Sequence, residues 1–310
     1  MRNVFYLISM AASMLLISCN YSGDKEKKEA DPIAEAGVES CKFEPLNIDI
    51  DSCTGSGSAN VVIEPRKAQR LIAHFGIFSP STNGLQTEYW LDKCEIQGLN
   101  DFFNKESGHD GAWITFASAN TASYKTYINI VPTKPDATGY YHKEDWAVNG
   151  SIPFPAGCAN YGEHFRNSLD PGISKYRSVH IKEGSAGEVK DLSRKIWVSG
   201  CVFKALHKII IAYSGAAVKL DGVIVYSAAY DSQVPLPQRG EGHSPSRPDQ
   251  STIILVPGYH CEGSDKPLPA WDVVAALYKH NVTDKMTAAA AASAYNHGEL
   301  CPDRCATDDQ

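Results

Sequence analysis

The sequence has no excess of basic residues. Among its 310 residues, 29 are Lys or Arg and 36 are Asp or Glu, which gives a formal net charge of −7. Proteins that bind nucleic acid present a basic face to the phosphate backbone. The composition therefore argues against a nucleic-acid partner and is otherwise ordinary for a soluble surface.

Sequence motifs of familiar catalytic and metal sites are also missing. No Cys-x-x-Cys pair and no His-Glu-x-x-His segment occurs, although zinc sites and zinc proteases use these spacings. Gly184-Ser-Ala-Gly187 has the wrong spacing for the Gly-x-Ser-x-Gly turn of a serine hydrolase. We therefore expect no catalytic residue, metal or cofactor.

Three groups of histidine and acidic residues leave a metal site open as an alternative. They are His142-Lys-Glu-Asp145, Glu163-His164 and His260-Cys-Glu262. All three lie in expected loops or at expected helix ends, and they could converge on one ion. Because the chain has 10 histidines, solvated loop residues are the preferred interpretation.

The apolar run at the N-terminus is too short to span a bilayer comfortably. It extends from Val4 to Ile17 behind the positively charged Arg2. It ends Leu16-Ile17-Ser18-Cys19, which resembles a bacterial lipobox. That resemblance implies cleavage of a signal peptide (1–18) and lipidation of Cys19, which would anchor the protein to a membrane. The alternative is an ordinary secretory signal followed by a chance cysteine.

The segment after this cysteine predicts a disordered tether. Residues 19–40 are rich in Lys, Glu, Asp, Gly and Ala and poor in large apolar side chains. Such a segment cannot bury enough surface to offset the entropy lost on ordering. Asp24-Lys-Glu-Lys-Lys-Glu29 loosely resembles the export signal of Bacteroidota surface lipoproteins, and a solvated spacer is the equal alternative.

Nine cysteines indicate an oxidising compartment. With Cys19 assigned to the lipid, eight remain as disulfide candidates, whose pairing stays open. They are Cys41, Cys53, Cys94, Cys158, Cys201, Cys261, Cys301 and Cys305. A thiol enzyme built on Cys201 and His207 is less favoured, because these residues lie on different faces of one expected helix.

A stretch of the chain occurs twice. Trp90 and Cys94 correspond to Trp197 and Cys201 at one constant offset in the sequence (197 − 90 = 201 − 94). In each stretch Asp-Gly precedes a β-rich run, and a second run ends in Val-Pro. We interpret the stretches as an internal duplication.

The duplication predicts an α+β fold of two tandem copies, covering 41–145 and 146–310. Each copy is expected to contain a helix, a short strand, a second helix and two strands. The first helix is expected from Glu64 with Ala68, Leu71 and Phe75 on one face, and its counterpart near Pro155. Asp92-Lys-Cys-Glu95 has the pattern of a capping box, and Ser199 is the equivalent cap.

Further elements complete the predicted architecture. Residues 112–118 and 124–131 are β-branched and aromatic, which predicts a hairpin. Two helices are expected C-terminally, over 270–280 and 284–296. Cys301-Pro-Asp-Arg-Cys305 is expected to close the chain as a disulfide-stapled tail.

Two pairs of repeated residues are candidates for a ligand site. Trp90 and Trp197 could stack on a sugar or peptide, but such tryptophans more often fill a core. Asp110 and Asp221 could form a pair of carboxylates at a cleft, but Asp-Gly is also a strong turn signal, and the turn is the preferred interpretation.

The longest connection between strands is a candidate contact loop. It extends over 231–250 and contains four prolines together with Arg239, His243 and Arg247. Proline prevents the loop from simply extending the hairpin, and loops on rigid scaffolds often carry function. The alternative is a neutral insertion, since closing a longer loop costs little stability.

These features resemble a family of exported Bacteroidota lipoproteins, over about half of the chain. The matching pieces are Ala68-Gln-Arg-Leu-Ile72, Trp90 to Phe103, Asp110-Gly111, Ile130-Val-Pro-Thr133 and Cys301-Pro302. The second copy departs from the pattern, with Gly258 in place of Thr. The resemblance implies location and fold and carries over no activity.

The sequence therefore favours a non-catalytic outer-membrane lipoprotein on the periplasmic or surface face. Its expected partners are the membrane, through the lipid, and an envelope protein or glycan. Two alternatives remain: a cell-envelope hydrolase with a site built from loops, and an immunity or inhibitor lipoprotein. Two or more titratable side chains converging in one pocket would favour an enzyme. An exposed aromatic patch with a polar rim would favour a binder.

Overall fold

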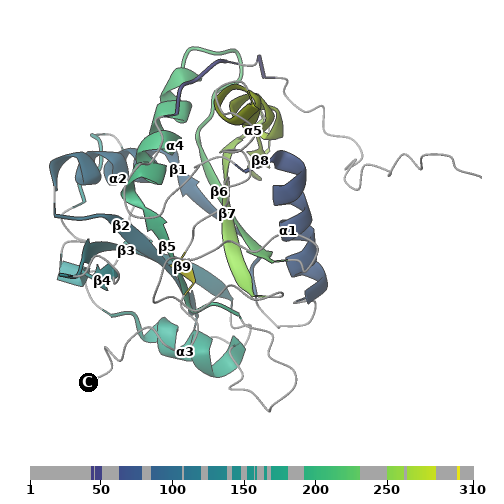
Figure 1. Ribbon diagram of the computed structural model, residues 1–310. Helices are drawn as coiled ribbons and strands as arrows, with labels where there is room; N and C mark the ends of the chain where they lie inside the picture. Colours follow the sequence, from purple (N-terminus) through teal and green to yellow (C-terminus); the bar gives the residue numbers. More distant parts are fainter. Residues whose placement is uncertain are drawn as a thin grey trace, which may run out of the picture. The chain divides into compact units, whose positions relative to one another are not determined.

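The protein is a mixed α+β structure with two antiparallel sheets, as seen in the computed structural model (Figure 1). The structure describes residues 43–44, 46–50, 63–78, 85–106, 108–119, 125–137, 142–147, 152–156, 158, 164–165, 169–180, 192–230, 250–261, 264–283 and 299–300. The expected signal peptide, Cys19, the tether, the helix over 284–296 and the cysteine tail lie outside these residues. The predicted α+β class is confirmed.

The first sheet has the strand order β1-β6-β7-β8. Its strands are β1 (Glu88–Asp92), β6 (Gly222–Ala229), β7 (Ser251–Tyr259) and β8 (Leu268–Pro269). Every residue of β6 is buried, which accounts for its continuous run of small and apolar side chains. A strand covered on both faces shows such a run, whereas a half-exposed strand alternates.

The second sheet has the strand order β4-β3-β2-β5-β9. Its strands are β4 (His142–Glu144), β3 (Thr126–Pro135), β2 (Gly111–Ser118), β5 (Lys195–Ser199) and β9 (Glu299–Leu300). The β2 and β3 strands form an antiparallel pair, so the predicted hairpin is confirmed. β2 is buried along its whole length, like β6.

Each sheet contains strands from both halves of the chain. β1 pairs with β6, and Asp92 lies opposite Gly222. β5 pairs with β2, and Ser199 lies opposite Gly111. The expected boundary at residue 145 therefore does not separate two independent sheets.

Two helices of equal length follow β1 and β5, the strands that pair with a strand from the other half of the chain. They are α2 (Lys93–Lys105) and α4 (Gly200–Ala212), each of 13 residues. They contact each other and reach both sheets. Phe103 of α2 stacks on Phe203 of α4, with 5.8 Å between the ring centroids. This helix pair lies in the largest hydrophobic cluster of the described residues.

The caps of both helices follow the sequence. Asp92 Oδ1 accepts hydrogen bonds from the backbone N–H groups of Cys94 (2.7 Å) and Glu95 (3.3 Å). Glu95 Oε2 in turn accepts from the Asp92 N–H at 3.0 Å, which completes a capping box. Ser199 caps α4 through the Cys201 N–H. Both predicted caps are present.

Three other helices cover the outer parts of the sheets. α1 (Pro65–Phe78) contacts β6 and α3 (Pro171–His180) contacts β2, and Figure 1 shows α1 beside the first sheet. α5 (Trp271–Tyr278) continues into the π-helical turn η2 (Lys279–Thr283). The apolar face predicted for α1 is buried. The expected helix near Pro155 is wrong, since Pro155 lies outside any helix and α3 begins only at Pro171.

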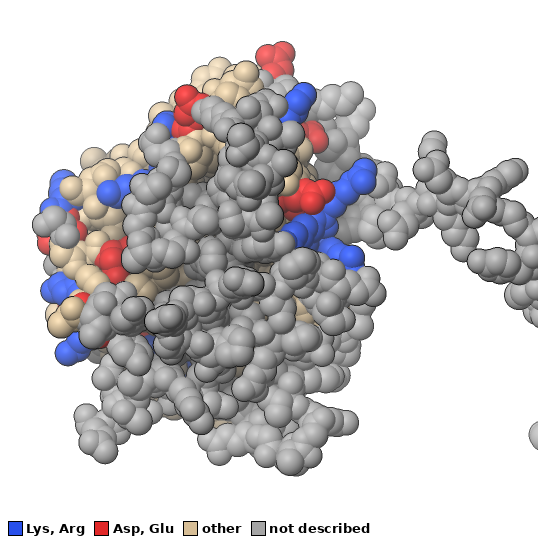
Figure 2. All heavy atoms as spheres, in the orientation of Figure 1, with Lys and Arg blue, Asp and Glu red and all other residues tan. Residues whose placement is uncertain are grey.

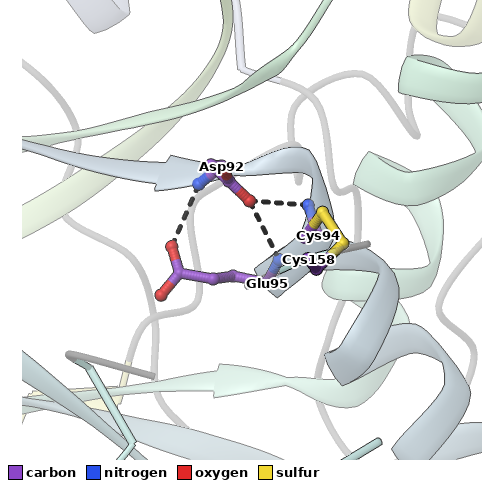
Figure 3. Close-up of a disulfide and its surroundings, with 4 residues drawn as sticks. All are labelled: Asp92, Cys94, Glu95 and Cys158. Atoms are coloured by element: carbon purple, nitrogen blue, oxygen red, sulfur yellow. Dashed lines mark hydrogen bonds between the residues drawn. A yellow bond between two sulfur atoms is a disulfide. The ribbon is translucent and has the colours of Figure 1, made fainter. Parts of the chain in front are cut away.

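One disulfide fastens the start of α2 to a distant segment. Cys94 and Cys158 are bonded, with 6.1 Å between their Cα atoms and a sequence separation of 64 (Figure 3). Cys201, at the corresponding position of α4, is also disulfide-bonded. Cys261 packs against the main hydrophobic cluster. Cys41, Cys53, Cys301 and Cys305 lie outside the described residues.

Candidate functional site

The two repeated tryptophans cover glycines on other strands of their own sheets. Trp90, in β1, covers Gly258, where an added Cβ would stand 2.7 Å from the indole. Trp197, in β5, covers Gly111, where an added Cβ would also stand 2.7 Å from the ring. Glycine is required at these places because any side chain would displace the ring or the strand.

The same packing leaves the two indoles with different surroundings. Trp197 is 7% exposed, clusters with Trp113 and stacks on His142 at 3.8 Å between centroids. Trp90 is half-buried and meets His260 edge to face at 4.9 Å. The structure therefore places Trp197 in the core and leaves Trp90 in contact with open space.

Asp110 belongs to a closed hydrogen-bond network. Its Oδ1 accepts from the Thr133 hydroxyl at 2.7 Å, and its Oδ2 lies 2.6 Å from Nδ1 of His142. Thr133 Oγ1 also accepts from the Trp197 indole N–H at 3.0 Å. The Asp110 carbonyl accepts from the Gly200 N–H at 2.8 Å. Asp110 therefore joins the start of β2 to the start of α4.

Asp221 occupies the corresponding place with one partner fewer. Its carbonyl accepts from the Lys93 N–H at 2.8 Å, and one carboxylate oxygen lies 2.9 Å from Nδ1 of His260. Its Oδ1 is buried and has no partner. Gly258 stands where the other half of the chain has Thr133, so the hydroxyl that would satisfy this oxygen is missing. Asp110 and Asp221 are not brought together in one cleft.

A cavity of about 710 Å³ opens beside Trp90. One wall is β1, with Glu88, Trp90 and Asp92, and the other is the start of β3, with Lys125 and Tyr127. We call this cavity the Trp90 groove. An indole framed by charged side chains is a common arrangement for binding a sugar or a peptide.

A Glu–His pair also lines the groove. Glu95 is 4% exposed, and its Oε1 lies 2.8 Å from Nδ1 of His164. The His164 carbonyl accepts from the Ile130 N–H at 2.8 Å, which ties this residue to β3. The sequence showed His164 only as a loop residue next to Glu163. Glu95 follows directly after Cys94, whose bond to Cys158 the sequence left open.

The floor of the groove is neutral and hydrogen-bonded. The Tyr89 hydroxyl lies 2.8 Å from Thr126 Oγ1 and donates to the Gln86 carbonyl at 3.1 Å. Burial raises the pKa of Tyr89 far above its ordinary value, so the phenol stays protonated. The carboxylates of Glu88 and Asp92 outnumber the ammonium of Lys125 along the walls. On the face seen in Figure 2, by contrast, acidic and basic side chains of the described residues are interspersed.

A second cavity, of about 530 Å³, lies at the start of α3. Its one carboxylate, Asp170, is buried and accepts hydrogen bonds from Tyr127 Oη (3.1 Å), Asn129 Nδ2 (3.0 Å) and the Gly172 N–H (2.8 Å). These bonds give Asp170 a structural role in capping the helix. This cavity is the weaker candidate.

Replacing Asp145 by Asn is expected to remove an acid-sensitive part of the stability. Asp145 accepts from Lys134 Nζ at 2.7 Å and lies 3.2 Å from His109 Nε2. The hydrogen bond from Lys134, with that from His109, lowers the pKa of this carboxyl against the effect of burial. The ionised form therefore stabilises the fold above the unfolded-state pKa, near 3.9. This contribution disappears as the pH falls through the lower, folded-state pKa.

Urea denaturation at pH 7 and at pH 3 would measure this effect. We expect Asp145→Asn to lose about 1 kcal/mol at pH 7 and less at pH 3, as for a partly exposed ion pair. Asp265→Asn, at an exposed bend, serves as the control. An equal loss at both pH values would contradict the assignment.

The remaining predicted site residues lie outside the described part of the chain. They are Cys19, Arg239, His243 and Arg247. Among the described residues, no three His, Cys, Asp or Glu side chains gather as metal ligands. No helix of the described part is long and apolar enough to cross a membrane.

Comparison with known proteins gives no relative. Neither a family model, nor a curated protein, nor a solved structure matches the chain.

Proposed function

We propose that the protein is a membrane-anchored exported lipoprotein whose folded body binds a ligand in the Trp90 groove without catalysis. The observation that carries the proposal is the half-buried indole of Trp90 on a cavity of about 710 Å³ with charged walls. Its counterpart Trp197 is buried by Trp113 and His142. A core role alone gives no reason for the difference.

The use of the acidic groups supports binding over catalysis. Asp92 and Glu95 are held by the capping box, and Glu95 also holds His164. Asp110 and Asp221 are held at strand ends by histidines and do not line the groove. Groups with such structural partners fix the shape of the groove, and the ligand meets the indole and the charged rim.

The sequence motivates the location. The lipobox at Leu16–Cys19 and the mixed-charge segment 19–40 favour an outer-membrane lipoprotein on a tether, like the exported Bacteroidota lipoproteins that the chain resembles. An envelope protein or a glycan is then the ligand within reach. Detergent phase separation of the wild type and of Cys19→Ala tests the anchor, and an unchanged distribution would reject it.

We further propose that the two halves arose by duplication. β1 and β5 have five residues each, and α2 and α4 have 13 each. The members of both pairs start at the same offset in the sequence (195 − 88 = 200 − 93). The orders β1-β6-β7-β8 and β5-β2-β3-β4 also correspond strand by strand. These correspondences support the proposal. The halves differ at the Trp90 groove, because Trp90 is half-buried and Trp197 is buried.

The groove is tested by removing its indole. Trp90→Ala is expected to weaken the retention of envelope glycan or protein fractions on the immobilised chain at least tenfold, because aromatic residues dominate binding sites. Trp271→Ala is the matched control, since Trp271 packs against the same hydrophobic cluster but does not line the groove. Equal retention by both variants would reject the groove as the site.

A second candidate function rests on the Glu95–His164 pair. A carboxylate 2.8 Å from an imidazole can orient it as a general base, and both residues line the groove. This arrangement favours an envelope hydrolase as the alternative. His164→Gln would then abolish the release of soluble fragments from purified envelope polymer while leaving binding intact. No release by the wild type would eliminate the hydrolase.

A further inference from the structure

The outer edges of β1 and β5 correspond, but only one is covered by a strand in the described part of the chain. β5 carries β9 on this edge, with Trp197 opposite Glu299 and Ile196 opposite Leu300 in antiparallel register. β1 is an edge strand of its sheet, and among the described residues its one neighbouring strand is β6. Glu88, Tyr89, Trp90 and Asp92 of this edge strand line the Trp90 groove.

The residues that precede β1 and β5 make the same kind of hydrogen bond. The Gln86 N–H donates to the Thr126 hydroxyl at the start of β3. The Ser193 N–H, at the same offset in the sequence as the two strands (193 − 86 = 195 − 88), donates to the Ser251 hydroxyl at the start of β7. The residue two positions before each short strand is therefore hydrogen-bonded to the beginning of a long strand of the other sheet.

The hydrogen-bond parity of β1 identifies the backbone groups that face the groove. Ser227 N–H donates to the Thr87 carbonyl, and Lys93 N–H donates to the Asp221 carbonyl. Residues that bond to an antiparallel neighbour alternate with residues that point away from it. Glu88 and Trp90 therefore direct their N–H and C=O groups away from β6. No backbone hydrogen bond of the described residues reaches these groups.

We propose that the Trp90 groove binds an extended peptide segment of a partner protein, added as a strand antiparallel to β1 as β9 is added to β5. This inference rests on the proposed binding function and specifies its ligand. β1 has five residues and offers a pairing length of about 17 Å at 3.3–3.4 Å per residue. The backbone bonds provide affinity, and alternate side chains meet the walls.

The walls select a cationic segment. Glu88 and Asp92 face the groove from β1, against Lys125 on the other side. The Glu88 side chain is 40% exposed and has Lys266 Nζ only at 3.9 Å, so a cation of the peptide can replace this distant ammonium. The side chain opposite Trp90 would lie against the indole, where a Lys or Arg gains a cation–π contact.

A second copy of this chain fits the groove poorly. Its own β1 carries the same acidic side chains, Glu88 and Asp92, which would repel their counterparts in an antiparallel pair of two β1 strands. A glycan would contact the indole but would not pair with the outward N–H groups of β1. The expected ligand is therefore a peptide, and binding of a glycan is one outcome of the test.

The test uses the full chain in detergent and a blocked Lys-Val-Lys-Val-Lys peptide, measured by calorimetry. Glu88→Pro and Glu88→Ala form the matched pair, because both lose the carboxylate but only proline also loses the outward N–H. Proline is tolerated at the first residue of a strand, and equal thermal midpoints would show that both variants fold. We expect Glu88→Ala to bind about threefold more weakly than the wild type, and Glu88→Pro about fivefold more weakly than Glu88→Ala.

Control ligands separate the possible outcomes. A Lys-Val-Lys-Val-Lys peptide N-methylated at alternate amides should bind at least tenfold more weakly than the unmodified peptide. A Glu-Val-Glu-Val-Glu peptide should bind no better than the N-methylated one. Equal affinities of Glu88→Pro and Glu88→Ala would overturn strand addition. Binding of an envelope glycan through Trp90 without peptide binding would overturn the peptide and leave the proposed function standing. If Trp90→Ala still bound the peptide and the glycan, the peptide proposal and the proposed binding function would both be rejected.

Discussion

Replacing Cys94 and Cys158 by alanine is expected to lower the free energy of unfolding by about 4 kcal/mol. The bond closes a loop between two cysteines whose sequence separation is 64. In the chain-entropy account, removing a bond across a loop of this length releases more disorder in the unfolded state than a short loop would. The loss should appear as a drop of roughly 10 °C in the thermal midpoint.

Cys94→Ala alone is the informative companion variant. It already breaks the bond, so we expect its stability to match that of the double variant within about 1 kcal/mol. The part of the groove lined by Glu95 and His164 should change as well, because the bond fastens Cys158 to Cys94, the neighbour of Glu95. An unchanged midpoint in the double variant would contradict the structural role of the bond.

Phe203→Ala is expected to destabilise the protein by about 4 kcal/mol. The side chain is fully buried and stacks on Phe103 across the contact between α2 and α4. Truncation removes the apolar burial and leaves a cavity that helices held to both sheets cannot close. Chemical denaturation followed by circular dichroism would measure the loss.

Ile211→Ala on the same helix provides the matched control. Ile211 is 52% exposed, so its truncation should change the stability by no more than about 0.5 kcal/mol. Similar losses in both variants would contradict the role of the contact between the helices, because alanine favours helix formation and Ile211 is exposed.

Local features of the fold could be predicted because their causes are local. The capping pattern of Asp92 and Glu95, the cap at Ser199 and the hairpin of β2 and β3 all depend on residues close in sequence. The apolar face of α1 follows from its period. Each of these signals is complete within a short segment.

The partners of the short strands could not be predicted in this way. The sequence offers β1 two similar partners, because β2 in its own half and β6 in the other half both begin with glycine. The period of a strand fixes which side chains share a face and leaves its partner open. The helix near Pro155 failed for a related reason, because a proline marks a permitted helix start and does not create one.

The candidate site was predictable in its residues and not in their roles. Asp-Gly indicated a turn before a strand, and Gly111 and Gly222 do begin strands, but their place under the indoles of Trp197 and Trp90 had no signal in the sequence. The tryptophans have the same sequence context, and only the tertiary neighbours Trp113 and His142 bury one of them. Exposure, which distinguishes Trp90, is a property of the assembled fold.

The pairing of β1 with β6, which lies in the other half of the chain, also sets the order in which the sheets form. The β2–β3 hairpin connects neighbouring segments and can form as soon as both have emerged. β1 must wait for β6, because β1 ends at Asp92 and β6 begins only at Gly222, after both strands of that hairpin and the whole of α3, β5 and α4. Pairing over such a distance requires a long loop to close before any contact rewards it, which slows folding. The first sheet is therefore formed late, and the chain remains open until most of its length is available.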